Sequence, residues 1–110
     1  MARVVCVADI NLDGAKTTAQ EIKKSGRTTL AVQVDVMKLT DLDKMVASTI
    51  DYFGRIHILV NDAGVSFFRP ALEVTEADWH AIFDVNLKGL FFATQRLLPY
   101  MLKQGKGKVC

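Results

Sequence analysis

The chain has 110 residues, of which 50% are hydrophobic and 24% are charged, with 14 Lys and Arg against 12 Asp and Glu. This length allows one domain at most, and the hydrophobic content is sufficient for a core and too high for a disordered chain. The basic residues are scattered and the net charge is only +2, so we expect no nucleic-acid partner.

The first strand is predicted at Arg3 to Ala8, a short β-branched run of the kind buried on both faces of a parallel sheet. A turn at Asn11 to Gly14 then opens a helix that extends to Ser25, with Gly26 as its stop. The apolar stripe of this helix is narrow and consists of Ala15, Ala19 and Ile22. A narrow stripe predicts that the helix lies at an edge of the molecule. A second strand is predicted at Thr29 to Val34.

A second helix is predicted to begin with Thr40 as its cap and Asp43 reaching back, as in a capping box, and to end at Gly54. Ile56 to Val60 is a third apolar strand, and the turn-rich segment from Asn61 to Pro70 follows it.

Thr75 and Asp78 repeat the capping pattern ahead of a long helix, which Pro99 should end or kink. Gly105 to Cys110 is predicted to turn into a fourth strand. The apolar face expected on the long helix is wide: Ile82, Phe83, Leu87, Leu90, Phe91, Thr94, Leu97, Leu98 and Met101.

Strands and helices alternate throughout, which predicts right-handed βαβ units and a doubly wound α/β fold with a parallel sheet. Ligands of such sheets bind outside the carboxyl ends of the strands. The residues at those ends are Asp9, Asp35 and the group Asn61-Asp62-Ala63-Gly64. Polar and acidic groups that could face a cofactor therefore follow three successive strands.

Four segments in this order and spacing, V-A-D, V-D-V, F-G-R-I-H-I-L-V-N-D-A-G and D-V-N-L-K-G, resemble the middle of the short-chain dehydrogenase/reductase family over residues 3–110. The resemblance implies that residues 1–110 are a partial NAD(P)-binding, Rossmann-like three-layer αβα domain. The family's first strand with its glycine-rich phosphate turn, and its catalytic Ser and Tyr-x-x-x-Lys, have no counterpart here. We therefore expect an incomplete fold, lacking the first strand and the C-terminal half, with an empty slot between strands 3–8 and 56–60.

The resemblance assigns NAD-binding roles to the strand ends. Asp9 would accept hydrogen bonds from the adenosine ribose and repel the 2′-phosphate of NADP, which predicts NAD as the cofactor; the alternative is an aspartate that caps the following helix. Asp35 and Val36 would hold the adenine, and the alternative for Asp35 is an ordinary turn residue. Ala63 and Gly64 would let the backbone approach the cofactor.

The resemblance also covers the asparagines. Asn61 would pin neighbouring strands, whereas Asp62 departs from the family pattern by replacing an amide with a carboxylate. Asn86 would be the catalytic-tetrad asparagine at a helix distortion, where its carbonyl holds a proton-relaying water; the alternative is an ordinary helical asparagine. Gly89 nearby favours the distortion. His57 and His80 have no matching ligands, so no metal site is expected.

The resemblance implies that the parent protein transfers a hydride between NAD(H) and a small-molecule carbonyl or secondary alcohol, and that it is a homo-oligomer. The apolar stretches at the start and elsewhere are too short to predict a signal peptide or a membrane span. Cys6 and Cys110 are expected to be free thiols of a cytoplasmic protein, and the alternative is a disulfide between them. The 110-residue chain alone is expected to be poorly stable and inactive. Two alternatives remain: a non-catalytic truncated chain that docks onto an intact homologue, and another nucleotide-binding Rossmann enzyme such as a methyltransferase. Reading the coding region upstream of Met1 for a glycine-rich turn would separate an incomplete record from a degenerate gene.

Overall fold

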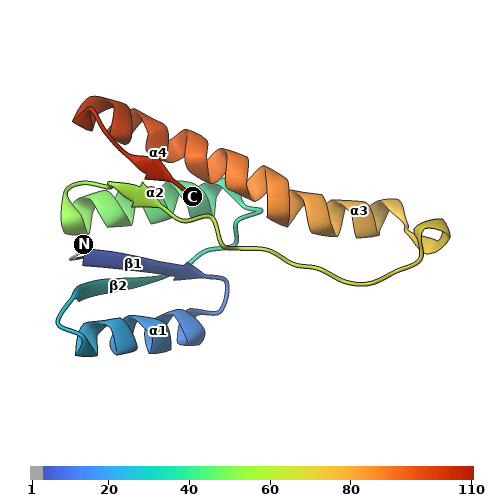
Figure 1. The fold of residues 1–110 in the computed structure, drawn as a ribbon, viewed down its shortest axis with the longest axis horizontal. Helices are drawn as coiled ribbons and strands as arrows, with labels where there is room; N and C mark the ends of the chain where they lie inside the picture. The colour runs from blue at the N-terminus through green and yellow to red at the C-terminus, as the bar shows by residue number, and fades with distance from the viewer. Residues whose placement is uncertain (1–3) are drawn as a thin grey trace.

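The computed structural model describes residues 4–110, in which strands and helices alternate (Figure 1). Arg3, the expected start of the first strand, lies outside these residues. The elements in chain order are β1 (Val4–Asp9), α1 (Leu12–Lys24), β2 (Thr28–Gln33), α2 (Leu39–Phe53), β3 (Ile58–Leu59), the 3-10 turn η1 (Ala71–Glu73), α3 (Glu76–Phe83), the π-helix η2 (Asp84–Gly89), α4 (Leu90–Gln104) and β4 (Lys108–Val109).

The strands form two separate parallel pairs. β1 pairs with β2 from Val4 opposite Thr28 to Asp9 opposite Gln33, and β3 pairs with β4. Within residues 4–110 no ladder joins β1 to β3. The predicted fold class, a doubly wound parallel α/β fold that is incomplete, is confirmed, and the predicted slot between these two strands is present.

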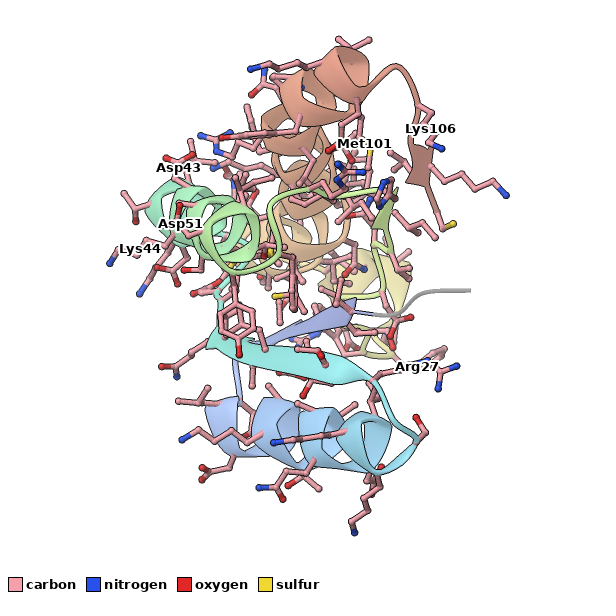
Figure 2. All side chains as sticks on the ribbon, turned by 90° about the vertical axis from the view of Figure 1, so that its left-hand side faces the viewer. Arg27, Asp43, Lys44, Asp51, Met101 and Lys106 are labelled. Carbon is pink, nitrogen blue, oxygen red and sulfur yellow. The ribbon has the colours of Figure 1, made fainter. Side chains whose placement is uncertain are left out.

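Helices cover the strands in three layers. α1 lies against one face of the β1–β2 pair, while α2 and α4 lie side by side on the other (Figure 1). Viewed along the strands, α1 and the β1–β2 pair occupy one part of the molecule and the α4–β3–β4 unit the other, with α2 alongside (Figure 2). Two buried clusters join α2 to its neighbours: Val34, Leu42 and Ala93 in one, and Val46, Ile56, Leu97 and Met101 in the other.

The predicted caps divide into one that is wrong and one that is confirmed. α2 begins at Leu39 behind Lys38, which makes no side-chain cap, so Thr40 lies inside the helix rather than capping it. The reason is the turn before it: the Lys38 N–H bonds to the Asp35 carbonyl and leads directly into the helix. Thr75 and Asp78 do form a capping box at α3.

β3 is shorter than predicted because only two of its residues pair with β4. Ile56, expected in the strand, instead bonds through its backbone N–H and carbonyl to the side chain of Gln104 at the end of α4. Gln104 Oε1 accepts from the Ile56 N–H at 3.1 Å, and Gln104 Nε2 donates to the Ile56 carbonyl at 2.7 Å. Of the two outcomes expected at Pro99, an end or a kink of the long helix, the end is wrong, because α4 runs on to Gln104 and has Gly105, whose φ is 79°, as its cap.

The wide apolar face predicted for the long helix is only partly buried. In α4, Ala93, Leu97 and Met101 are buried against α2 and β3. Other members of the predicted face are exposed: Phe83, Leu87, Leu90, Phe91 and Leu98. Hydrophobic spacing predicts which side of a helix is apolar, but not how much of that side the rest of the chain covers.

Candidate functional site

Asp9 is the last residue of β1 and its side chain is exposed. One carboxylate oxygen accepts from the Asn11 N–H at 2.9 Å, which fixes the turn after the strand. Asn11, not Asp9, caps α1, since its side chain accepts from the Gly14 N–H at 3.0 Å. The capping alternative for Asp9 is therefore wrong, and its second oxygen is available for a ligand at the strand end.

Asp35 and Val36 follow β2 and are both half-buried. The Asp35 backbone N–H donates to Asp41 Oδ2 at 3.0 Å, and Asp35 Oδ1 accepts from the Met37 N–H at 3.0 Å. The turn role proposed as the alternative for Asp35 thus occupies one oxygen of its carboxylate. Asp41, in the first turn of α2, is a positioning residue that sequence reasoning missed; its place six residues after Asp35 was the signal available.

Gly89, the last residue of η2, contacts Val36 directly. A Cβ atom at Gly89 would lie 2.9 Å from Val36 Cβ and 3.2 Å from its carbonyl oxygen, so a side chain would have to displace Val36. Real Cβ atoms do not approach others this closely, which makes glycine a packing requirement here. The sequence indicated Gly89 only as support for a helix distortion, because a contact across 53 positions has no local signal.

Asn86 lies within the π-helix η2, so the predicted helix distortion is present at this residue. Its Oδ1 accepts from the Val65 N–H at 2.8 Å and its Nδ2 donates to the Val65 carbonyl at 2.8 Å. The asparagine therefore holds the segment after β3 with both ends of its amide. A Cβ atom at Gly64 would lie 3.3 Å from Asn86 Oδ1, so glycine lets this segment approach η2. These bonds give the Asn86 side chain a structural role, and its catalytic role stays a prediction.

Asn61 joins three elements at the end of β3. Its backbone N–H donates to the Cys110 carbonyl at 2.9 Å, which ties the segment to β4, and its Nδ2 donates to Thr94 Oγ1 on α4 at 3.3 Å. Asp62 and Ala63 are exposed. Thr94 is a further positioning residue that was predicted only as part of an apolar face.

These contacts run along one rim of the molecule. The Asp9 carbonyl accepts from the N–H of Val34, the residue before Asp35, at 2.9 Å. Val36 contacts Gly89 of the π-helix η2. Asn86, on the same π-helix, bonds to Val65, which follows Gly64. All four strands point toward this side of the molecule (Figure 1). The strand ends predicted from sequence therefore connect through η2, at the edge of the fold where ligands of parallel sheets bind.

Other chemistry is limited in the part of the chain that the structure describes. Residues 4–110 contain no group of three His, Cys, Asp or Glu side chains placed to hold a metal, and no helix long and apolar enough to cross a membrane. Cys6 and Cys110 are free thiols. Burial raises the pKa of the Cys6 thiol, an effect that the Thr49 hydroxyl partly offsets, so Cys6 is a weak nucleophile.

The family model for short chain dehydrogenase matches residues 1–110. The chain belongs to the short-chain dehydrogenase family. It is 36% identical over 105 residues to the dehydrogenase subunit BbsD of Thauera aromatica, covering 96% of this chain and 42% of that one. It is also 36% identical to the sorbitol dehydrogenase of Cereibacter sphaeroides, covering 94% and 39%.

Among solved structures, the chain is similar to a 7α-hydroxysteroid dehydrogenase complexed with NADH and 7-oxo glycochenodeoxycholic acid. The TM-score is 0.91 at 30% identity, over 96% of this chain and 41% of that one. The chain thus spans about two fifths of the length of the relatives it matches. Membership of this oxidoreductase family rules out the alternative of a different Rossmann enzyme such as a methyltransferase.

Proposed function

We propose that residues 1–110 are the part of an NAD(P)-binding Rossmann domain that receives the adenosine half of NAD. The observation that carries the proposal is the continuous rim from Asp9 through Val36 and Gly89 to Asn86 and Gly64. Carboxylates, a half-buried apolar residue and small residues lie along it, which is the set of groups that an adenosine and its ribose require.

Each group of the rim has a distinct task. The exposed carboxylate of Asp9 accepts from the ribose hydroxyls and repels a 2′-phosphate; two unit charges about 4 Å apart at an effective dielectric of 20 repel by on the order of 4 kcal/mol. This repulsion favours NAD over NADP. Asp35 accepts from the adenine amine with the oxygen that the Met37 turn leaves open, while Val36 packs on the ring.

The rest of the rim positions the backbone for the nicotinamide half. Asn61, Ala63 and Gly64 form the small-residue bend after β3, and the Asn86 side chain fixes that bend through Val65. When bound, NAD supplies the hydride acceptor for oxidation of a secondary alcohol, and NADH the donor for reduction of a carbonyl. Asn86 contributes as a catalytic residue by orienting a proton-carrying water from the distorted turn of η2.

The 110-residue chain has no Tyr-x-x-x-Lys sequence, since Tyr52 is followed four residues later by Ile56 and Tyr100 by Gln104. The family's general acid/base would have to come from further chain. We therefore expect no steady hydride transfer by the purified chain. The parent protein is proposed to be a cytoplasmic homo-oligomer that acts on a small carbonyl or alcohol.

A chimera tests the proposal. Residues 4–110 would replace the matching segment of the 7α-hydroxysteroid dehydrogenase, which supplies the remaining chain. The chimera should reduce 7-oxo glycochenodeoxycholic acid with NADH, and its kcat/KM with NADH should exceed that with NADPH by at least tenfold. A chimera that is folded by circular dichroism but transfers no hydride from NADH would refute the proposal.

The second candidate, a non-catalytic chain that acts only by docking onto an intact homologue, is favoured by the absence, within residues 4–110, of a strand ladder between β1 and β3. For this candidate, the chimera should fold, but the rim residues should contribute nothing to hydride transfer. Substitutions at Asp9 and Asn86 should then leave the kcat/KM of the chimera unchanged.

A further inference from the structure

Basic side chains gather at one end of the molecule, where the amino ends of the strands lie. Three segments lead into β2, β3 and β4 from the last turns of α1, α2 and α4, and they span residues 21–27, 50–57 and 101–108. These segments share one end because the paired strands are parallel and all four strands point the same way (Figure 1). We call the surface that the three segments form the basic end.

The basic end holds seven of the 14 Lys and Arg residues but only two of the 12 Asp and Glu residues. The other ten carboxylates lie in the first halves of the helices or in the segments before them, toward the opposite end. Charges that are scattered in the sequence are therefore separated along the strand direction by the fold. The basic residues are Lys23, Lys24, Arg27, Arg55, Lys103, Lys106 and Lys108, and the acidic ones are Glu21 and Asp51.

The positive charges of the basic end are not neutralised by neighbouring carboxylates. Six of the seven side chains are exposed, and Arg27 is half-buried and donates to Ser25 Oγ at 2.9 Å. Within residues 4–110, the ion pairs of Arg69 and Arg96 lie outside the basic end, and no ion pair includes Arg55 or any of its lysines.

Helix dipoles explain only part of this arrangement. Cations are stabilised near the C-terminus of a helix, and Lys23, Lys24 and Lys103 lie in the last turns of α1 and α4. The other four basic residues of the set follow the helix ends, where this preference does not place them. The excess of positive charge therefore exceeds what helix capping requires.

The charges extend across the whole basic end. Figure 2 looks onto this end and shows Arg27 beside α1 and Lys106 on the far side, beyond α4. The molecule measures 31 × 24 Å across its 49 Å long axis, so a compact anion cannot contact both sides, whereas a flat anionic surface contacts all three segments. Tyr52 and Leu102, which are 59% and 77% exposed, lie among these charges, and such side chains enter the interface of a bilayer.

We propose that the basic end binds the surface of an anionic phospholipid bilayer and that the opposite, acidic end points away from it. Clusters of about four to eight Lys and Arg bind anionic lipid surfaces, and the basic end has seven. Because the acidic end is repelled by the same surface, the charge separation selects one orientation. The inference does not depend on the proposed cofactor site, which lies at the carboxyl ends of the strands and stays open to solvent in this orientation.

Sedimentation with lipid vesicles measures the binding. The chain should bind vesicles of about 30% phosphatidylserine in phosphatidylcholine and should not bind vesicles of phosphatidylcholine alone. Raising the NaCl concentration from about 50 to about 300 mM should weaken binding at least tenfold, because salt screens exposed charges. Equal binding to both kinds of vesicle, or no binding to either, overturns the proposal.

Paired removals of charge locate the binding surface. Lys103→Gln with Lys106→Gln should weaken vesicle binding at least tenfold, and Lys23→Gln with Lys24→Gln, on the α1 side, should do the same. The control pair is Lys16→Gln with Lys44→Gln, which removes two exposed charges outside the basic end and should weaken binding less than threefold. Equal weakening by all three pairs, or weakening by the first pair alone, overturns the proposal.

Tryptophan fluorescence tests the orientation. Trp79, the single tryptophan, is 55% exposed in α3, at the end of the molecule far from the basic end (Figure 1). Vesicles that contain brominated phosphatidylcholine, a short-range quencher, should leave its fluorescence unchanged when the chain binds. In a Trp79→Phe variant that also carries Leu102→Trp, the tryptophan lies at the basic end, and its fluorescence should fall about twofold. Equal quenching at the two positions overturns the proposal.

Folding and nucleic-acid binding are checked separately. Where circular dichroism shows that the chain alone is unfolded, the same charge pairs are removed in the chimera with the 7α-hydroxysteroid dehydrogenase, and the same order of effects is expected. Tighter binding to duplex DNA than to phosphatidylserine vesicles at the same salt concentration would make the basic end a nucleic-acid surface and overturn the proposal.

Discussion

Gly89 and Val36 are in contact so close that no side chain fits between them: a Cβ atom at Gly89 would lie 2.9 Å from Val36 Cβ. The π-helix η2, which carries Asn86, therefore rests directly on the residue proposed to pack against adenine. This contact, together with the buried cluster of Val34, Leu42 and Ala93, holds the two halves of the proposed NAD site against each other, one after β2 and one on the long helix.

Gly89→Ala should disturb both halves. Overpacking of this kind costs about 1–3 kcal/mol, because Val36 or η2 has to move. In the chimera we expect a lower free energy of unfolding in urea and a KM for NADH raised about tenfold. Gly14→Ala is the control: it is also a helical glycine, its nearest neighbour for a Cβ is 3.4 Å away, and it should be neutral or slightly stabilising. Equal effects of the two substitutions would contradict the packing argument.

The Gly89–Val36 contact shows where sequence reasoning stops. The strand ends at Asp9, Asp35 and Asn61 were predictable, because short apolar runs and turn residues are local signals. The contact that joins them depends on how α4 packs over α2, which is set by buried residues far apart in the chain. The same holds for Ile56, which was predicted as a strand residue although Gln104 takes both its backbone groups.

Asp9→Asn should relax the preference for NADH over NADPH, because it removes the charge that repels a 2′-phosphate. Allowing for the exposure of Asp9, we expect the ratio of kcat/KM values in the chimera to fall about 10- to 100-fold, which corresponds to roughly 1.4–2.8 kcal/mol. Asp13→Asn, which removes an exposed carboxylate from the first turn of α1, is the matched control and should leave the ratio unchanged. A ratio that falls equally in both variants would show a general charge effect instead.

Asn86→Ala should release the segment after β3, because the Val65 N–H and carbonyl both lose their partner. Since water can replace these exposed hydrogen bonds, the closed position of the segment should lose only about 1 kcal/mol of stability. The population of the open segment should then rise roughly fivefold. Chymotrypsin cleavage after Phe67 and Phe68, both exposed, measures this directly and should quicken by about that factor.

Gln20→Ala, on the exposed side of α1, is the control for Asn86 and should leave the cleavage rate unchanged. Unaltered cleavage in the Asn86 variant would mean that the amide does not restrain the segment. In the chimera, kcat should fall in Asn86→Ala with a smaller change in KM, since the distorted turn that positions its carbonyl is retained only in part.

The cap of α3 was predictable in full, whereas that of α2 was not. Asp78 accepts from the Thr75 N–H at 2.9 Å and also pairs with Arg69 at 3.3 Å, and the capping box forms as the spacing predicts. At α2 the tight turn after Asp35 starts the helix one residue before Thr40. Asp43, the expected partner of Thr40, instead pairs with Arg96 at 2.6 Å, and Asp41 accepts from the Asp35 N–H. A local motif is decisive only where no tertiary partner is closer.

The α3 cap should be lost in acid. The pKa of Asp78 is lowered, chiefly by the Thr75 backbone N–H, which donates to its carboxylate at 2.9 Å, with smaller contributions from the Thr75 hydroxyl and Arg69. A carboxyl group whose folded pKa lies below its unfolded value of about 3.9 stabilises the fold above that value, and this stabilisation disappears as the pH falls through the folded pKa. The loss should therefore occur below about pH 4.

Trp79 is the single tryptophan of the chain and stacks on Phe83 at 4.0 Å, so its fluorescence reports on α3. An acid titration should show a transition below about pH 4 that Asp78→Asn abolishes, because the amide carries no titrating charge. Glu73→Gln, which removes a neighbouring exposed carboxylate, should leave the transition in place. A midpoint above the ordinary aspartate range, or a transition that persists in Asp78→Asn, would show that the capping box does not control the acid response of this helix.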